Sequence, residues 1–115
     1  MLARTYSLKG QENFEKVEKE GKLVRFDSFG LAYLKRNDSD VPRFGFIVSL
    51  KVSKDAVQRN RIKRALSEAV RLMVNDTKKG YDVVFLARPE SARRGTDVLM
   101  RETQAAFIKA ELLQA

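Results

Sequence analysis

The residues best suited to chemistry form one basic block, Arg59-Asn60-Arg61-Ile62-Lys63-Arg64. Arginine carries a planar guanidinium that binds two phosphate oxygens at once, and lysine adds a mobile positive charge. Residues 51–71 hold seven basic and two acidic residues, so +5 of the total charge of +8 falls in this stretch. Charge gathered in this way predicts a defined surface for a polyanion, and nucleic acid is the leading candidate.

A helix over residues 55–75 is predicted to position this block, because its apolar residues recur at helical spacing. They are Ile62, Leu66, Ala69, Val70 and Met73. The opposite side of the helix carries Asn60, Arg64, Ser67 and Arg71. A charge run is often only a solvated face, but each cation near a helix N-terminus costs about 0.3–1 kcal/mol. Only Glu68 is spaced to pair with Arg64, so we interpret the face as functional.

The composition excludes several classes of protein. The 115 residues include no cysteine and no histidine, which removes thiolate nucleophiles, Ser-His-Asp triads and cysteine-based metal sites. We therefore predict no catalytic residue and no metal ligand on the protein. No apolar run approaches the ~20 residues that span a bilayer, and an amphipathic membrane helix is disfavoured because the apolar stripe lacks aromatics. We expect a single cytoplasmic RNA-binding domain over residues 1–115.

The remaining elements follow from periodicity and from breaks at glycine and proline. A short amphipathic helix is predicted over residues 11–20, ended by Gly21, and a final helix with Thr96 or Asp97 as its N-cap. Strands are predicted near residues 23–25, 26–36, 43–52 and 81–87. The runs 26–36 and 43–52 look like an antiparallel hairpin. The expected order is αβββαβα, an α/β fold (an α+β sandwich) with a mixed sheet of about four strands packed by helices.

The sequence resembles the protein subunit of bacterial ribonuclease P. The resemblance rests on Arg43-Phe44-Gly45-Phe46-Ile47-Val48-Ser49-Leu50-Lys51, followed at the family's spacing by the basic block at residues 59–64. It extends to Asn13-Phe14-Glu15-Lys16-Val17 near the start and to Tyr81-Asp82-Val83-Val84-Phe85-Leu86-Ala87-Arg88 near the end. It therefore covers nearly the whole chain.

The resemblance implies a small protein bound to a catalytic RNA, which together remove the 5′ leader of precursor tRNA. It also implies Mg²⁺ held mainly by the RNA, a left-handed crossover between parallel strands, and a monomer in a 1:1 complex. The predicted contacts to the catalytic RNA are Arg59, Asn60, Arg61, Lys63, Arg64 and Arg71. The predicted contacts to the single-stranded leader are Phe14, Tyr33, Lys51 and Lys54.

The leader cleft departs from the family pattern at two positions. Glu18 stands where a second aromatic is often found, and Ala32 where a tyrosine is common, unless a shift of one residue gives that role to Tyr33. Phe14 itself has two readings, a stacking platform for unpaired bases and a core residue that pins the first helix to the sheet. We expect Lys78-Lys79 and Arg93-Arg94 to be solvated loop charges, and Asp82 to be a strand-start residue.

Two other functions remain open at this point. A general structured-RNA-binding or ribosome-associated protein would use the same basic helix with little preference among RNAs. A protein nuclease acting alone is disfavoured by the amino-acid inventory.

Overall fold

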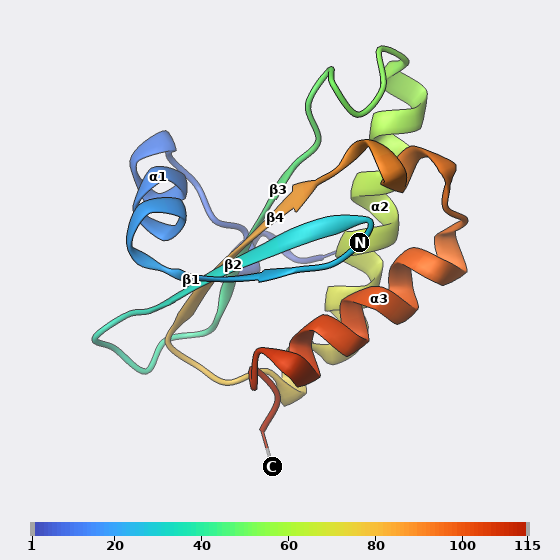
Figure 1. Cartoon of the computed structure of the whole chain (residues 1–115). Coiled ribbons are helices and arrows are strands. Elements are labelled where there is room, and N and C mark those ends of the chain that lie inside the picture. The colour runs from blue at the N-terminus through green and yellow to red at the C-terminus, as the bar shows by residue number, and fades with distance from the viewer. Residues whose placement is uncertain (1, 115) are drawn as a thin grey trace.

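The computed structural model describes residues 2–114 and confirms the predicted order of elements (Figure 1). Met1 and Ala115, the two ends of the expected domain, lie outside the described residues. The helices are α1 (Gln11–Glu20), α2 (Ala56–Met73) and α3 (Thr96–Lys109), and the strands are β1 (Lys22–Arg25), β2 (Phe29–Lys35), β3 (Arg43–Ile47) and β4 (Tyr81–Ala87). Short 3₁₀ turns lie at η1 (Arg4–Tyr6), η2 (Val74–Asp76) and η3 (Pro89–Arg93).

The four strands form one mixed sheet in the order β1-β2-β4-β3. β2 pairs antiparallel with both β1 and β4, whereas β3 pairs with β4 in parallel. The predicted hairpin between the second and third strands is therefore wrong, because β4 lies between them. β4 buries four consecutive residues, and a strand with both faces covered takes an interior place in a sheet.

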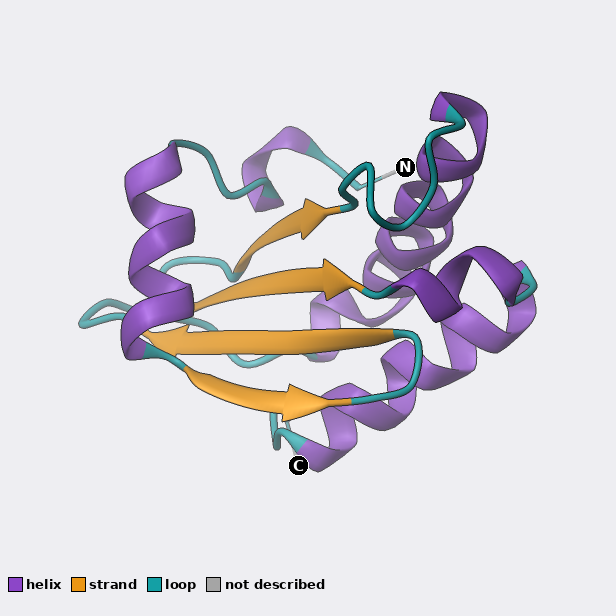
Figure 2. Cartoon of the chain, turned by 45° about the horizontal axis from the view of Figure 1, so that its top comes forward, coloured by secondary structure: helices purple, strands orange, loops and turns teal. Residues whose placement is uncertain are grey.

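The connection from β3 through α2 to β4 is the crossover that joins the two parallel strands. In Figure 2 β3 and β4 point the same way and α2 lies behind the sheet, so the path from β3 to β4 runs in the left-handed sense. This is the handedness that the family resemblance implies and the reverse of the general rule for such units. β3 is also shorter than predicted, and residues 48–55 form the connection to α2, which is largely exposed apart from the buried Val52.

The two faces of the sheet carry separate apolar clusters. The larger cluster joins α2 and α3 to the sheet. α2 contributes aliphatic side chains such as Ile62 and Leu66, and α3 contributes Phe107, whose ring stacks 6.0 Å from Phe44 and 6.1 Å from Phe85 between centroids. The smaller cluster lies under α1 and includes Val17, Ala32 and Val84. Because side chains alternate along a strand, β2, β3 and β4 contribute to both clusters.

The N-terminal ends of α2 and α3 have different capping residues. Asp55 is the N-cap of α2, and its carboxylate accepts a hydrogen bond of 2.9 Å from the Val57 amide. Gly95 is the N-cap of α3, so the prediction of Thr96 or Asp97 at that position is wrong by one or two residues.

A buried ion-pair network closes the loop between β2 and β3, where the sequence suggested only a strand-start residue. The Asp82 carboxylate accepts hydrogen bonds of 2.6 Å from Arg36 and of 2.8 and 2.9 Å from Arg43. The Arg36 guanidinium also donates to Asp38 and to the backbone oxygen of Val41. The network therefore ties residues 36–43 to the start of β4.

Candidate nucleic-acid interface

The predicted basic face of α2 lies on the solvent side of the helix. Ile62, Leu66 and Val70 are buried against the sheet, whereas Asn60 and Arg64 are exposed on the opposite side. Lys63 and Arg71 are exposed as well, and Arg59 and Arg61 lie half-buried at its flanks. We call these six residues together the basic face of α2: Arg59, Asn60, Arg61, Lys63, Arg64 and Arg71. The helix thus brings together all six predicted contacts to the catalytic RNA.

The cations of the basic face are held in different ways. Arg59 donates through Nη1 to the backbone oxygen of Ser53 at 2.9 Å, and Arg61 donates through Nε to the Gln58 side chain at 2.5 Å. These bonds orient the two guanidiniums and leave their remaining N–H groups for a ligand. Among the ion pairs within residues 2–114, none engages Arg59, Arg61, Lys63 or Arg64.

Arg71 differs because it forms an ion pair with Glu68, three residues before it on the same helix. The Arg71 guanidinium donates hydrogen bonds to that carboxylate and lowers the pKa of Glu68 to about 2. The pairing in turn raises the pKa of Arg71. Glu68 therefore pairs with Arg71 and leaves Arg64, the partner suggested by spacing, to other contacts.

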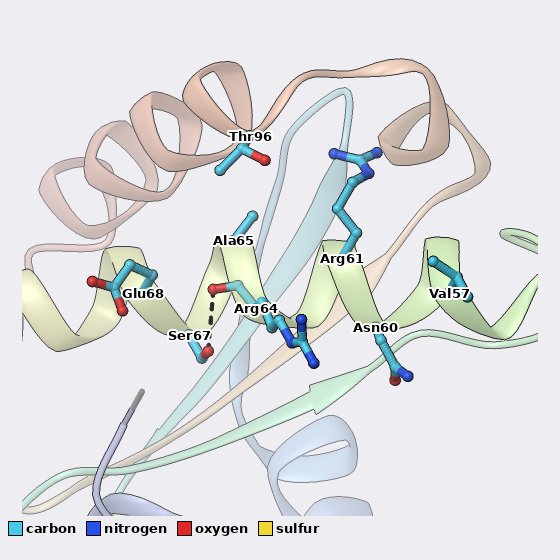
Figure 3. A pocket seen from close by; sticks show the side chains of 8 residues that line it. All are labelled: Val57, Asn60, Arg61, Arg64, Ala65, Ser67, Glu68 and Thr96. Atoms are coloured by element: carbon cyan, nitrogen blue, oxygen red, sulfur yellow. Dashed lines mark hydrogen bonds between the residues drawn. The ribbon is translucent and has the colours of Figure 1, made fainter.

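Two concavities flank the row formed by the exposed Asn60 and Arg64 and the half-buried Ser67. The one toward α3 has a volume of about 740 Å³ and is shown in Figure 3. The one toward the N-terminal segment has a volume of about 400 Å³ and is lined by Leu2, Ala3, Ser7 and Phe46 together with α2. The basic face therefore lies between two hollows. Such a surface can contact other parts of an RNA besides its phosphate backbone.

Phe14 joins α1 to the opposite face of the sheet. Its ring packs on β3 at Gly45, where a Cβ would lie 2.3 Å from the nearest ring atom. The side chain is half-buried beside Val17 and Ala32, so the ring serves the core on one side and faces solvent on the other. Glu18 is exposed on the same helix, one turn further on.

Beyond α1 the same face of the sheet continues as a partly open strip. Cross-strand pairing places Gly30, Leu86 and Ile47 in one row, and Ile47 and Leu86 are only half-buried. Arg25 lies opposite Gly30 on β1, and Arg88 follows Leu86 on the same face by the two-residue alternation. Both arginines were missed in the sequence, where only the strand pairing could have shown that they border this strip.

The other predicted leader contacts are not all brought to this strip. Lys51 and Lys54 are exposed in the connection that follows Ile47, between the strip and the start of α2. Tyr33 packs instead against the larger cluster, with its ring centroid 6.5 Å from that of Tyr81. Ala32 occupies the α1 side of β2, so a shift of one residue does not bring Tyr33 there.

Within residues 2–114 no group of three or more aspartates and glutamates lies close enough to hold a metal ion, so we assign no step to a protein-bound metal. No helix in the same range has the length and apolar character needed to cross a membrane.

Comparisons with known proteins agree with this geometry. A sequence model of the family described as Ribonuclease P matches residues 2–111. The ribonuclease P protein component of Clostridioides difficile is 44% identical over 89 residues, 76% of each chain. That of Caldanaerobacter subterraneus subsp. tengcongensis is 35% identical over 114 residues, which are 99% of this chain and 97% of the relative.

Solved structures show the same fold. The ribonuclease P protein of Staphylococcus aureus superposes with a TM-score of 0.89 at 24% identity, covering 96% of this chain and all of that one (100%). The protein from Thermotoga maritima gives a TM-score of 0.77 at 25% identity, covering 87% of this chain and 93% of the other.

Proposed function

Because this chain belongs to the ribonuclease P protein family, we propose that the basic face of α2 binds the catalytic RNA and that the strip beside α1 receives the leader of precursor tRNA. The protein is a subunit of the ribonucleoprotein endoribonuclease that matures the 5′ end of tRNA. In this family the RNA carries out the hydrolysis. A general structured-RNA-binding role is not favoured.

The observation that carries the first assignment is the set of four cations without a carboxylate partner on one helix. Arg59, Arg61, Lys63 and Arg64 lie within two helical turns and form no ion pair among residues 2–114. A phosphate backbone supplies the missing negative charges, and binding releases the counterions condensed on the RNA. The catalytic RNA is the larger polyanion of the enzyme and suits the broader charged surface.

The strip beside α1 suits a single strand better. Phe14 offers one side of its ring for stacking, while Ile47 and Leu86 supply an apolar floor. Lys51 and Lys54 are exposed in the connection that follows Ile47 and supply charge for the strand's phosphates. Stacking of this kind tolerates many leader sequences, since every base has a flat face.

Ribonuclease P is typically a Mg²⁺-dependent enzyme. The described side chains do not form a carboxylate site for Mg²⁺, so in our proposal the RNA holds the ion and the protein contributes positive charge that helps the RNA and its substrate approach each other. We also propose one protein per catalytic RNA, with the free protein inactive toward precursor tRNA.

The test is cleavage of precursor tRNA at low Mg²⁺ by a bacterial ribonuclease P RNA, with and without this chain. We expect the protein to increase cleavage at the mature 5′ end and to cut nothing without the RNA. If the protein binds the catalytic RNA of its own source but does not increase cleavage, the proposed function fails and only a role in RNA binding remains.

A further inference from the structure

We propose that the groove between α2 and the start of α3 accepts one unstacked base of the catalytic RNA, with Arg61 and Arg64 binding the phosphates on either side of it (Figure 3). This base groove is lined by Val57, Arg61, Arg64, Ala65 and Thr96. The inference deepens the proposed function and rests on it, because the occupant belongs to the same RNA.

The shape of the base groove suits a flat apolar group. Its floor is Ala65, a small residue that is 2% exposed, and its open end is Val57, an apolar side chain that is 76% exposed on the helix surface. The volume of about 740 Å³ falls within the range of about 300–1,000 Å³ that is typical of small-molecule sites. Phosphate contacts alone need only a convex charged surface, and they do not account for an apolar hollow. We therefore assign the hollow to a base, which is flat and has apolar faces.

The two arginines flank this apolar floor from different sides. In Figure 3 Arg61 points toward the segment that leads into α3, whereas Arg64 points to the opposite, open side of α2. Gln58 fixes the first of them, since it accepts from Arg61 at 2.5 Å and donates to the backbone oxygen of Ala92 at 3.4 Å. Arg61 is therefore held in place before the RNA arrives, and neither of its terminal nitrogens has a hydrogen-bond partner within residues 2–114.

An acidic residue at the far end of the groove limits where a nucleotide can bind. Glu68 lines that end, and its carboxylate is engaged by Arg71. A negative charge there disfavours a phosphate, so the nucleotide fits over Ala65 and Val57. Arginine planes also stack on bases, which adds affinity for an unpaired nucleotide over a continuous duplex.

The catalytic RNA is the occupant that the fold favours. The base groove lies on α2, across the sheet from Phe14 and the strip that we assign to the leader. A single strand bound beside α1 does not reach it without passing round the sheet. Sequence-specific recognition of RNA mostly uses bases that have left the stack, and an enzyme RNA with junctions and loops provides them.

The test is to fill the groove without changing its charge. Thr96 is exposed at the first turn of α3 and its side chain makes no hydrogen bond in the described structure, so Thr96→Trp blocks the space at little cost to the fold. We expect the variant to bind the catalytic RNA about 5- to 150-fold more weakly, the range for losing one stacked base. Ala105→Trp, exposed elsewhere on α3, is the matched control and should bind like the wild type.

Chemical probing of base edges in the RNA gives a second readout. At least one single-stranded base should be protected by the wild type and by Ala105→Trp, and reactive again with Thr96→Trp. Val57→Trp closes the groove from the α2 side, so a folding defect in one variant leaves the other informative.

The outcomes separate this inference from the proposed function. If both groove variants bind normally with unchanged base protection, the groove is empty in the complex and the inference fails. If Arg64→Ala nevertheless weakens binding, the assignment of α2 to the RNA survives that failure. Normal binding by Arg64→Ala as well would overturn both.

Discussion

Removing the four unpaired cations of α2 should flatten the salt dependence of RNA binding. The variant carries alanine at Arg59, Arg61, Lys63 and Arg64, none of which has an ion-pair partner among residues 2–114. Each cation that neutralises a phosphate contributes about 0.7–0.9 to the slope of log Kobs against log salt. If each of the four contacts one phosphate, the slope should fall in magnitude by about 3.

This change in slope is large enough to measure directly. Between 50 and 200 mM salt, a difference of about 3 means that the wild type loses roughly 60-fold more affinity than the variant. The assay is the Kd of the catalytic RNA alone, measured by filter binding at four or more KCl concentrations. The variant should also bind more weakly than the wild type at the lowest salt, where the electrostatic contribution is greatest.

A control with the same loss of charge separates contact from net charge. Alanine at Lys22, Lys35, Lys78 and Lys79 removes four cations that lie away from α2. The control should keep a slope close to that of the wild type. Equal slopes for the wild type and the α2 variant would refute the assignment, because the α2 cations would then contact no phosphate.

Three further predictions concern the fold and the leader strip. Asp82→Ala removes the buried carboxylate that Arg36 and Arg43 share and leaves Arg36 only the exposed Asp38, so it should lower the free energy of unfolding in urea by about 3 kcal/mol; a loss below about 1 kcal/mol would contradict this. Gly45→Ala places a methyl group 2.3 Å from the Phe14 ring, so precursor tRNA should lose part of its binding advantage over mature tRNA in paired Kd measurements; an unchanged ratio would exclude Phe14 from the leader site. The pKa of Glu68 falls from 4.5 to about 2 on folding, so the stability that the ionised Glu68 carboxylate adds is fully present above pH 4.5 and is lost as the pH falls toward 2. The difference in melting temperature between the wild type and Glu68→Gln should therefore shrink over that range, and a constant difference would contradict this.

The sequence predicted the helices well because their ends carry local signals. Gly21 closes α1 at the predicted residue, since a Cβ there would lie 2.5 Å from the Val17 oxygen and 2.6 Å from the Tyr33 oxygen. The apolar stripe of α2 likewise fixed which side of the helix faces the sheet, and hence which cations face outward. Both signals act over a few residues and are readable without the rest of the fold.

Strand order and the leader strip could not be predicted in the same way. The pairing of β3 with β4 joins residues about 40 positions apart, and no local pattern specifies it. Tyr33 illustrates the consequence, because its face depends on the register of β2 against β4. For the same reason the sequence predicts only a strand-start role for Asp82, since its arginine partners come from other parts of the chain.

The interior position of β4 also governs when the chain can fold during its synthesis. β1 and β2 can pair as soon as both are made. β3 forms only the isolated bridge from Phe44 to Ser7 until residues 82–86 of its ladder partner β4 have been made. Phe107, whose ring stacks on Phe44 on the face of the sheet that α2 and α3 cover, is made later still. The basic segment is therefore translated well before it has a scaffold, and its binding face is presented only by the nearly complete chain.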